Sequence, residues 1–139
     1  MIQFTSHGIS FRLQNKNKVR QWIRDILLSE GKPAGELAFV FCDDAYLSEM
    51  NMKYLKHSTL TDIITFDYSE KKALSGDILI SIDRIRDNAA KYSTTFNDEL
   101  GRVMAHGVLH LLGYNDKSPG EKVEMRNREE RYKSAFPNK

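Results

Sequence analysis

Short apolar runs with strand-like patterns are spread over the first 82 residues of the chain. Ile2–Thr5 and Ile9–Leu13 both alternate apolar and polar side chains, which predicts two short strands. Leu37–Cys42 is a compact apolar run of the kind found in buried strands. Ile63–Phe66 and Ile78–Ile82 are rich in β-branched residues and have polar flanks, so we expect strands there too.

Helical spacing appears between these runs. A first helix is predicted by five apolar residues that recur three or four positions apart: Val19, Trp22, Ile23, Ile26 and Leu27. Asn15 or Asn17 can cap its start, and a Gly-Lys-Pro sequence ends it. Asp43 or Asp44 can cap a short helix that runs through about Tyr54.

Three further helices are predicted in the second half of the chain. Asp83 can cap one of them, and a second runs from about Asn97 to Leu112. The last begins at Ser118, where a Pro at the first helical position and a Glu three residues on form a capping box, and it runs to about Phe136. Strands that come early and helices that come later favour an α+β fold.

Composition is that of an ordinary globular protein. The chain has 139 residues, 40% of them apolar and 29% charged, which predicts one domain over residues 1–139. Cys42 is the one cysteine, so an internal disulfide framework is excluded and a reducing compartment is favoured. No apolar run reaches the roughly 18–20 residues of a membrane span, and the N-terminus lacks a signal-peptide pattern. We therefore expect a cytoplasmic protein with no membrane association.

Charge is divided unevenly along the chain although its net value is only +2. Residues 1–35 carry a net charge of +4, residues 36–116 one of −5 and residues 117–139 one of +3. Basic ends can contact phosphate while an acidic centre holds a cation. On charge alone, helices of mixed charge that are simply solvated are the more common explanation.

One stretch carries a pattern for metal chemistry. His106 and His110 are four residues apart on a predicted helix, so both imidazoles lie on one face. Gly113 stands where a helix ends in a left-handed residue and the chain turns back, which brings Asp116 under the helix end. Two neutral imidazoles and one carboxylate leave an open position for water, as a catalytic metal site requires. A histidine pair alone is more often structural, but the helix stop and the carboxylate favour a metal site.

Zinc is the first choice of metal for this ligand set, with one ion per chain. Fe, Mn and Ni stay open, because two histidines and a carboxylate also suit other transition metals. The helix of a zinc metallopeptidase places a Glu directly after the first histidine as general base, and that position is Gly107 here. Hydroxide supplied by metal-bound water, whose pKa falls toward about 7, would suit phosphodiester hydrolysis instead.

The run from His106 to Tyr114 resembles the signature of the bacterial YbeY proteins, the rRNA-maturation endoribonucleases. Asn51 and Tyr54 together with the segment 61–66 are similar to a second block of that family, and the segment 76–81 to a third. Their spacing and order hold from about residue 36 to 125. The histidine block is highly specific, and the other two blocks are supportive.

This resemblance implies a zincin-like α+β domain with a mixed sheet of about four strands and one zinc. It also implies a single-strand-specific endoribonuclease that acts on the 3′ end of small-subunit rRNA and in ribosome quality control. Small-subunit rRNA and the small ribosomal subunit would be the partners, and the acidic middle of the chain could bind a basic ribosomal protein. A metallopeptidase role is a standing alternative for the family.

The sequence departs from the family pattern at two places. The third metal ligand of the family is usually His, whereas Asp116 stands at the matching position. The family usually has Arg directly after the aromatic residue of the second block, and that position is Leu55 here. Lys53, Lys56 or His57 could contact RNA in place of that Arg, although His57 is as readily a bystander.

Four other residues have two interpretations each. Asp77 is either a strand-start cap, the slightly favoured role, or a partner that orients a ligand imidazole. Glu99 lies two helical turns before His106, and a solvated helix-start carboxylate is favoured over a base near the site. Trp22 and Tyr54 could stack on bases, but Trp22 fits the apolar stripe of its helix and is expected in the core.

Two hypotheses of different classes follow. The first is a metal-dependent endoribonuclease in which His106, His110 and Asp116 act through metal-bound water, while Arg20 and Arg24 help to hold the RNA backbone. The second is a ribosome-assembly factor with a structural zinc, which is motivated by Leu55 and by the lack of an obvious general base. A zinc metallopeptidase ranks third because of Gly107.

Overall fold

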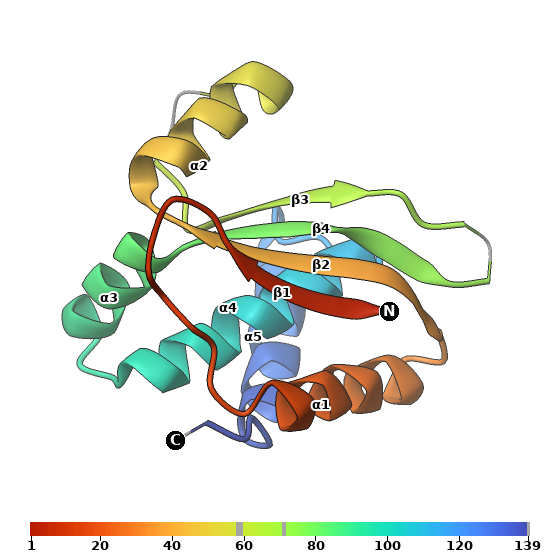
Figure 1. Cartoon of the computed structure of the whole chain (residues 1–139). Coiled ribbons are helices and arrows are strands. Elements are labelled where there is room, and N and C mark those ends of the chain that lie inside the picture. The colour runs from red at the N-terminus through yellow and green to blue at the C-terminus, as the bar shows by residue number, and fades with distance from the viewer. Residues whose placement is uncertain (58–59, 71, 139) are drawn as a thin grey trace.

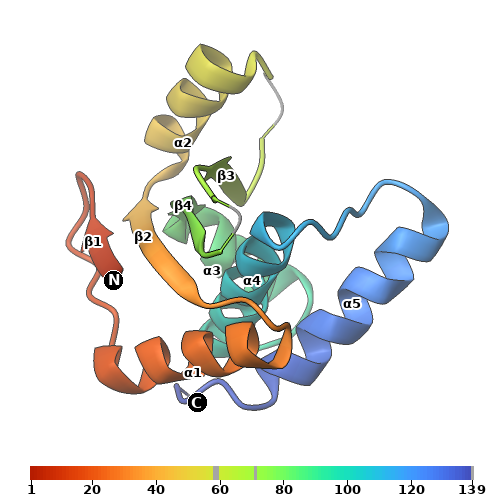
Figure 2. The same cartoon turned by 90° about the vertical axis from the view of Figure 1, so that its right-hand side faces the viewer.

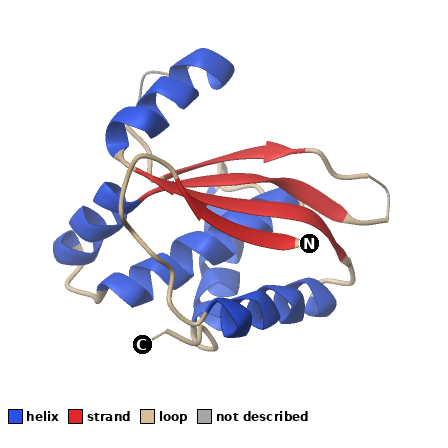
Figure 3. Cartoon of the chain, viewed as in Figure 1, coloured by secondary structure: helices blue, strands red, loops and turns tan. Residues whose placement is uncertain are grey.

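The computed structural model describes residues 1–57, 60–70 and 72–138. The described strands and helices follow one another along the chain as shown in Figures 1 and 3: β1 (Ile2–Ser6), α1 (Lys16–Ser29), β2 (Ala34–Cys42), α2 (Asp44–Met50), the π-helix η1 (Asn51–Leu55), β3 (Ile63–Asp67), β4 (Leu74–Ser81), α3 (Ile82–Lys91), α4 (Phe96–Leu111) and α5 (Pro119–Lys133). The expected α+β architecture with a sheet of four strands is confirmed.

The sheet is mixed and has the order β1-β2-β4-β3. β1, β2 and β4 are parallel, whereas β3 runs antiparallel to β4 and forms one edge. α1, α4 and α5 lie on one face of the sheet, and α2 with η1 projects from the other (Figures 1 and 2). This arrangement sets the C-terminal half of α4 beside β3, which is where the histidine motif lies.

Alternation along β3 and β4 supplies apolar side chains to both faces of the sheet. Ile63, Ile78 and Ile80 belong to the main core between the sheet and the helices α1, α4 and α5. Ile64 and Leu79 point to the opposite face, where they pack with residues of α2 in a smaller cluster. Both clusters bury apolar surface, the main driving force for folding, so the sheet is supported from both sides at β3.

The predicted strand at Ile9–Leu13 is wrong. Gly8 has a φ of +70° and directs the chain away from the sheet after β1. Phe11 then packs edge-on against Phe41, with ring centroids 5.0 Å apart, and Leu13 is buried. The apolar residues of this segment therefore anchor a loop to the core, which produces the same alternating pattern as a strand.

The helix starts follow the capping predictions in two of four cases. Asp43 caps α2 by accepting from the backbone N–H of Tyr46, and Ser118 begins α5 with a complete capping box. α3 is capped by Ser81 rather than Asp83, which lies in its first turn and accepts from the backbone of α2 instead. Asn15 occupies the position before α1 but makes no side-chain cap, and its φ of 54° differs from the extended backbone of a capping residue. Its amide N–H donates to Asn138 near the C-terminus.

The C-terminal segment ties α1 to α4. α5 ends at Lys133 rather than near Phe136, whose ring packs edge-on against Trp22 and fills the space left by Gly101. Trp22 is buried and donates its indole N–H to the Tyr132 carbonyl, so its expected core role is confirmed. Within the part of the chain that is described, no helix has the length and apolar content needed to cross a membrane.

Cys42 lies buried at the end of β2, as a small core residue would. Burial raises the pKa of its thiol to about 12, and the carboxylates of Asp43, Asp44 and Asp83 contribute to the rise. A thiol with so high a pKa is not a nucleophile at neutral pH.

Candidate metal centre

α4 carries both histidines on the face that is not covered by the sheet. Thr95 caps the helix, and acidic residues in its first turn suit the positive end of the helix dipole. His106 and His110 follow one turn apart, with ring centroids 4.4 Å apart and ring planes nearly perpendicular. Both are only partly buried, whereas Val108 and Leu109 between them are fully buried.

Gly107 stands at the position where a zinc metallopeptidase has its general base, and the close packing of α4 on the sheet explains why this residue has no side chain. A Cβ at this residue would lie 2.8 Å from Ile63 Cδ1 and 2.9 Å from Ile78 Cγ2, closer than such atoms can approach. The helix thus packs directly onto β3 and β4 at this point, and the position faces the sheet. A glutamate here would have to displace the core, so the structure has no room for the base that a zinc metallopeptidase uses.

Asp116 reaches the histidines because the chain reverses after α4. Gly113 has a φ of +104°, which favours glycine, and Tyr114 N–H returns to the carbonyl of Leu109. Asp116 Oδ2 then lies 3.5 Å from His106 Nε2 and 3.4 Å from His110 Nε2.

A buried carboxylate outside the site holds the loop that carries Asp116. Glu30, just after α1, accepts hydrogen bonds from the Tyr114 and Tyr132 hydroxyls and pairs with Arg128 Nη1 at 2.8 Å. Burial opposes ionisation of Glu30, but these partners outweigh it and lower its pKa. The loop is therefore tied to both α1 and α5.

The three predicted ligands form a set that a metal ion can use. One ligand atom from each of His106, His110 and Asp116 lies within 4.8 Å of the other two. Burial, followed by the charge of the neighbouring His106, lowers the pKa of His110, although Asp116 opposes that shift. The neutral imidazole that results is the form that binds metals. Two imidazole nitrogens and one carboxylate oxygen suit zinc, so the donor set fits the expected ion.

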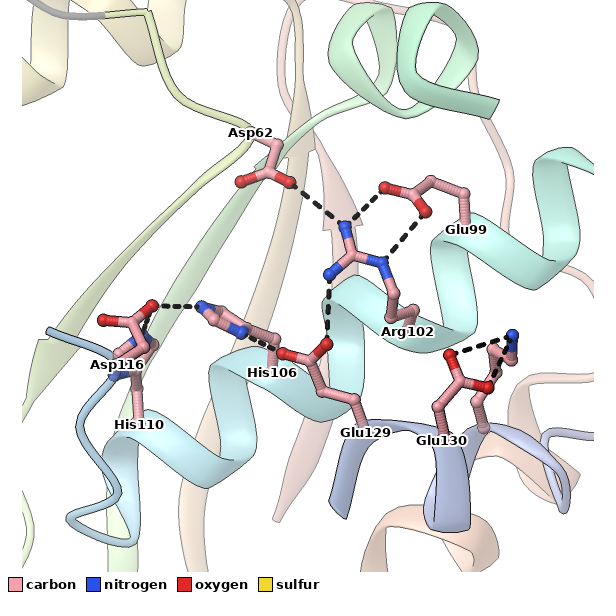
Figure 4. A network of polar contacts seen from close by, with 9 residues as sticks. Asp62, Glu99, Arg102, His106, His110, Asp116, Glu129 and Glu130 are labelled. Carbon is pink, nitrogen blue, oxygen red and sulfur yellow. Dashed lines mark hydrogen bonds and ion pairs between the residues drawn. The ribbon is translucent and has the colours of Figure 1, made fainter. Parts of the chain in front are cut away.

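A network of ion pairs borders this group on the side of α5 (Figure 4). Arg102, one turn before His106, makes a bidentate pair with Glu99, with contacts of 3.0 and 2.6 Å. The same guanidinium lies 3.1 Å from Glu129 Oε1 and 3.8 Å from Asp62 Oδ2. Glu129 also contacts Nδ1 of His106 through its other oxygen. The carboxylate of Glu99 is almost fully buried, so its favoured interpretation as a solvated residue is wrong.

Burial and charge set the pKa values of the two acidic residues at the ends of this network. For Glu129, burial favours the neutral acid, but the hydrogen bond and charge of His106, together with Arg102, hold the pKa below its ordinary value. For Asp62, burial dominates over the charge of Arg102 and raises the pKa. Glu129 is thus an ionised acceptor between two donors.

The candidate metal centre lies in an open cleft of about 810 Å³. One wall comes from α4 and the loop after it, with Arg102, Lys117 and the three predicted ligands. The other wall comes from η1 and the edge of β3. The described residues that line this second wall are Asn51, Leu55, His57 and the consecutive positions from Thr61 to Thr65.

The predicted RNA-contacting residues are distributed unevenly around this cleft. His57 lines it, whereas Lys53, within η1, and Lys56, directly after it, are not among the lining residues. Arg20 and Arg24 are not among the lining residues of the cleft. Both belong to α1, which Figure 2 shows beneath the sheet and away from β3. Their contact with RNA stays a prediction.

The sequence patterns assign no functional role to four residues of the site: Asp62, Arg102, Lys117 and Glu129. Asp62 belongs to the second family block, which gives it no role. Glu129 lies 23 residues after His106 on another helix, so no local spacing marks it. Asp77 lies in the middle of β4, so its favoured role as a strand-start cap is wrong. It accepts from the hydroxyl of Tyr68, just after β3, and the described partner of His106 Nδ1 is Glu129.

The fold and the site together define an α+β domain with a His/His/Asp group in a cleft beside an antiparallel edge strand. Residues 2–136 match the family described as Endoribonuclease YbeY, and the chain belongs to that family. Two Flavobacterium proteins named Endoribonuclease YbeY are similar over 94% of this chain. The one from Flavobacterium psychrophilum is 47% identical over 92% of its own length, and the one from Flavobacterium johnsoniae is 45% identical over 93%. The expected family is thereby confirmed, and an endoribonuclease role is supported.

A solved structure shares the fold at lower sequence similarity. A Thermotoga maritima protein whose solution structure is known superimposes with a TM-score of 0.68, covering 98% of this chain and 89% of its own. Its sequence is 22% identical, so this likeness concerns the architecture alone.

Proposed function

We propose that this protein is a metal-dependent endoribonuclease that cleaves single-stranded segments of rRNA, including the 3′ end of small-subunit rRNA, in the cytoplasm. The convergence of His106, His110 and Asp116 in one wall of the open cleft is the observation that carries the proposal. Family membership supports the nuclease activity, and the ligand set supports zinc as the metal. When bound, zinc polarises a phosphoryl oxygen and lowers the pKa of a bound water.

The remaining residues of the cleft suit a single strand of RNA. Lys117 and His57 lie on opposite walls and can contact the backbone from both sides. Tyr54 is not among the lining residues, but it is 53% exposed on the same π-helix as Leu55, where its ring can stack on a base, because every base has a face that aromatic side chains can cover. Arg102 also lines the cleft, but its guanidinium is engaged by three carboxylates and is not available for phosphate.

Leu55 favours the alternative, a ribosome-assembly factor with a structural zinc. This residue lines the cleft at the position where the family resemblance implies an arginine, so that wall lacks the expected cation. The small ribosomal subunit would remain the partner, and cleavage would not be required.

Cleavage of a precursor small-subunit rRNA fragment by the zinc-loaded protein tests the proposal. We expect the wild-type protein to cleave and His110→Ala to lose both cleavage and bound zinc, as measured by mass spectrometry of metal content. His7→Ala, purified identically, is the matched control because His7 stacks on Tyr46 away from the cleft. Equal cleavage by wild type and His110→Ala would reveal a contaminating nuclease and refute the proposal. A zinc-loaded wild type that binds the small subunit without cleaving would support the assembly factor.

A further inference from the structure

His106 is contacted at both of its ring nitrogens. Nε2 faces Asp116 at 3.5 Å, while Nδ1 contacts Glu129 Oε2 on the opposite side of the ring (Figure 4). A neutral imidazole has one N–H and one lone pair, so the group at one nitrogen decides what the other nitrogen can do.

Glu129 is itself fixed by a second donor. Its carboxylate is almost fully buried on α5, and its other oxygen accepts from Arg102 Nη1 at 3.1 Å. Arg102 cannot turn away, because Glu99 holds the guanidinium through two hydrogen bonds from within the same helix. Both oxygens of Glu129 are therefore placed by contacts that involve neither substrate nor metal.

From this arrangement we infer that Glu129, oriented by Arg102, is a positioning residue that keeps the proton of His106 on Nδ1. The lone pair of Nε2 is then directed toward Asp116 and the candidate metal centre. The inference deepens the proposed function, because an oriented Nε2 matters only if a metal binds there. A carboxylate behind a ligand imidazole also increases its basicity, and loss of such a partner commonly weakens metal binding about 10–100-fold.

The chemistry of Arg102 makes Glu129→Gln a sharp test. The guanidinium only donates, so the oxygen of the new amide would face Arg102 and its NH₂ group would face His106 Nδ1. An NH₂ group there requires a lone pair on Nδ1, which moves the ring proton to Nε2 and blocks the metal-facing nitrogen. His110 serves as an internal reference, because its ring bonds to the backbone of Tyr114, which the substitution leaves in place.

Glu130→Gln is the matched control. Glu130 is the next residue on α5, its carboxylate is 55% exposed, and it pairs with Lys133 at 3.2 Å on the side away from the cleft (Figure 4). The two substitutions remove the same charge from the same helix turn, so a general effect of charge or of α5 stability would appear in both.

Two measurements decide the inference. Correlations between ring nitrogens and ring protons in NMR spectra of the metal-free protein identify the tautomer of His106, and competition with a chromophoric chelator gives the zinc Kd. We expect Glu129→Gln to move the His106 proton to Nε2 and to weaken zinc binding about 10–100-fold. Glu130→Gln should change neither quantity.

Either of two results would overturn the inference: a folded Glu129→Gln protein that keeps the proton on Nδ1, or one that binds zinc as wild type does. If wild type bound no zinc, the proposed function would fail, while the tautomer measurement would still report on Glu129.

If Glu129→Gln did not fold, Arg102→Lys would replace it. Lysine keeps the positive charge but lacks the planar guanidinium that binds several carboxylate oxygens at once, so we expect zinc affinity to fall about 10-fold or less. An unchanged Kd would contradict the role of Arg102.

Discussion

The two walls of the cleft are built on different principles. The wall formed by α4 is polar and held from behind: His106, Arg102 and Glu129 engage one another, and Gly107 lets the helix lie directly on the sheet. The wall formed by η1 and the edge of β3 includes the partly exposed side chain of Leu55, and Tyr54 on the same π-helix is exposed next to it in the sequence. A rigid wall suits ligands that must be placed accurately, while an exposed one suits a chain that lies across it.

The ion pairs behind α4 also affect the folding stability of the protein. Each buried acidic residue behind α4 is acceptable only while a donor stays in place, because an unpaired buried charge is strongly unfavourable. On the η1 wall, Leu55 is partly exposed and carries no buried charge, so substitutions at this residue should act on ligand binding more than on folding. Three substitutions probe this contrast.

Arg102→Ala should have the largest effect on stability. It leaves Glu99 and Glu129 buried without their shared cation, which is expected to lower the free energy of unfolding by about 3–5 kcal/mol. Urea denaturation measures the loss, and Arg126→Ala, an exposed position on α5, should unfold like wild type. A loss below about 1 kcal/mol would show that the α4 wall does not depend on this network.

Gly107→Ala should have an intermediate effect. The added Cβ meets Ile63 and Ile78 at distances that force the helix or these side chains to move, and overpacking of this kind costs about 1–3 kcal/mol. Gly120→Ala is the natural comparison, because nothing lies within 4 Å of a Cβ there and alanine favours a helix. In thermal unfolding, the melting temperature of Gly107→Ala should therefore fall, while that of Gly120→Ala should rise or stay unchanged. Equal stability of the two would mean that the close approach of α4 to the sheet is not tight.

Leu55→Arg should have the smallest effect on stability and a measurable one on binding. Leu55 is 38% exposed, so folding should be nearly unaffected, while a cation is added to the cleft wall. Affinity for a single-stranded RNA oligonucleotide should rise a few-fold, and its dependence on the logarithm of salt concentration should steepen by about 0.7 for one added phosphate contact. Fluorescence anisotropy at several salt concentrations measures both. Tyr92→Arg, at the exposed end of α3, should leave the binding unchanged, and a similar gain there would point to charge alone.

Local patterns sufficed for most elements of this protein. Apolar periodicity located α1 and α4, β-branched runs located β3 and β4, and the capping box marked the start of α5. The predicted strand at 9–13 was wrong for a physical reason. This segment has the alternation of a strand because its apolar side chains reach a core formed by distant residues, and sequence spacing cannot distinguish a strand from a loop anchored in this way.

The candidate metal centre likewise contains residues that local sequence patterns identify and residues that only tertiary packing brings together. His106, His110, Gly113 and Asp116 were within reach of the sequence because they lie on one helix and the turn that follows it, where local geometry dictates their approach. Glu129 and Asp62 were not, because α5 and the segment before β3 meet α4 only after the chain has folded. Arg102 lies one turn before His106 on α4, but its partners Glu129 and Asp62 lie on other elements, so its role was not apparent either. Their partnership comes from packing, which leaves no periodic trace in the sequence.

The sequence by itself thus determined which side chains can hold a metal ion and excluded the peptidase base from its usual position. Tertiary structure decided how those side chains are held: Glu129 behind His106, the α4 helix pressed onto the sheet at Gly107, and Leu55 on the facing wall. The physical reason is the range of the forces involved. Helix and turn geometry acts within a few residues, whereas burial and ion pairing join groups that are far apart along the chain.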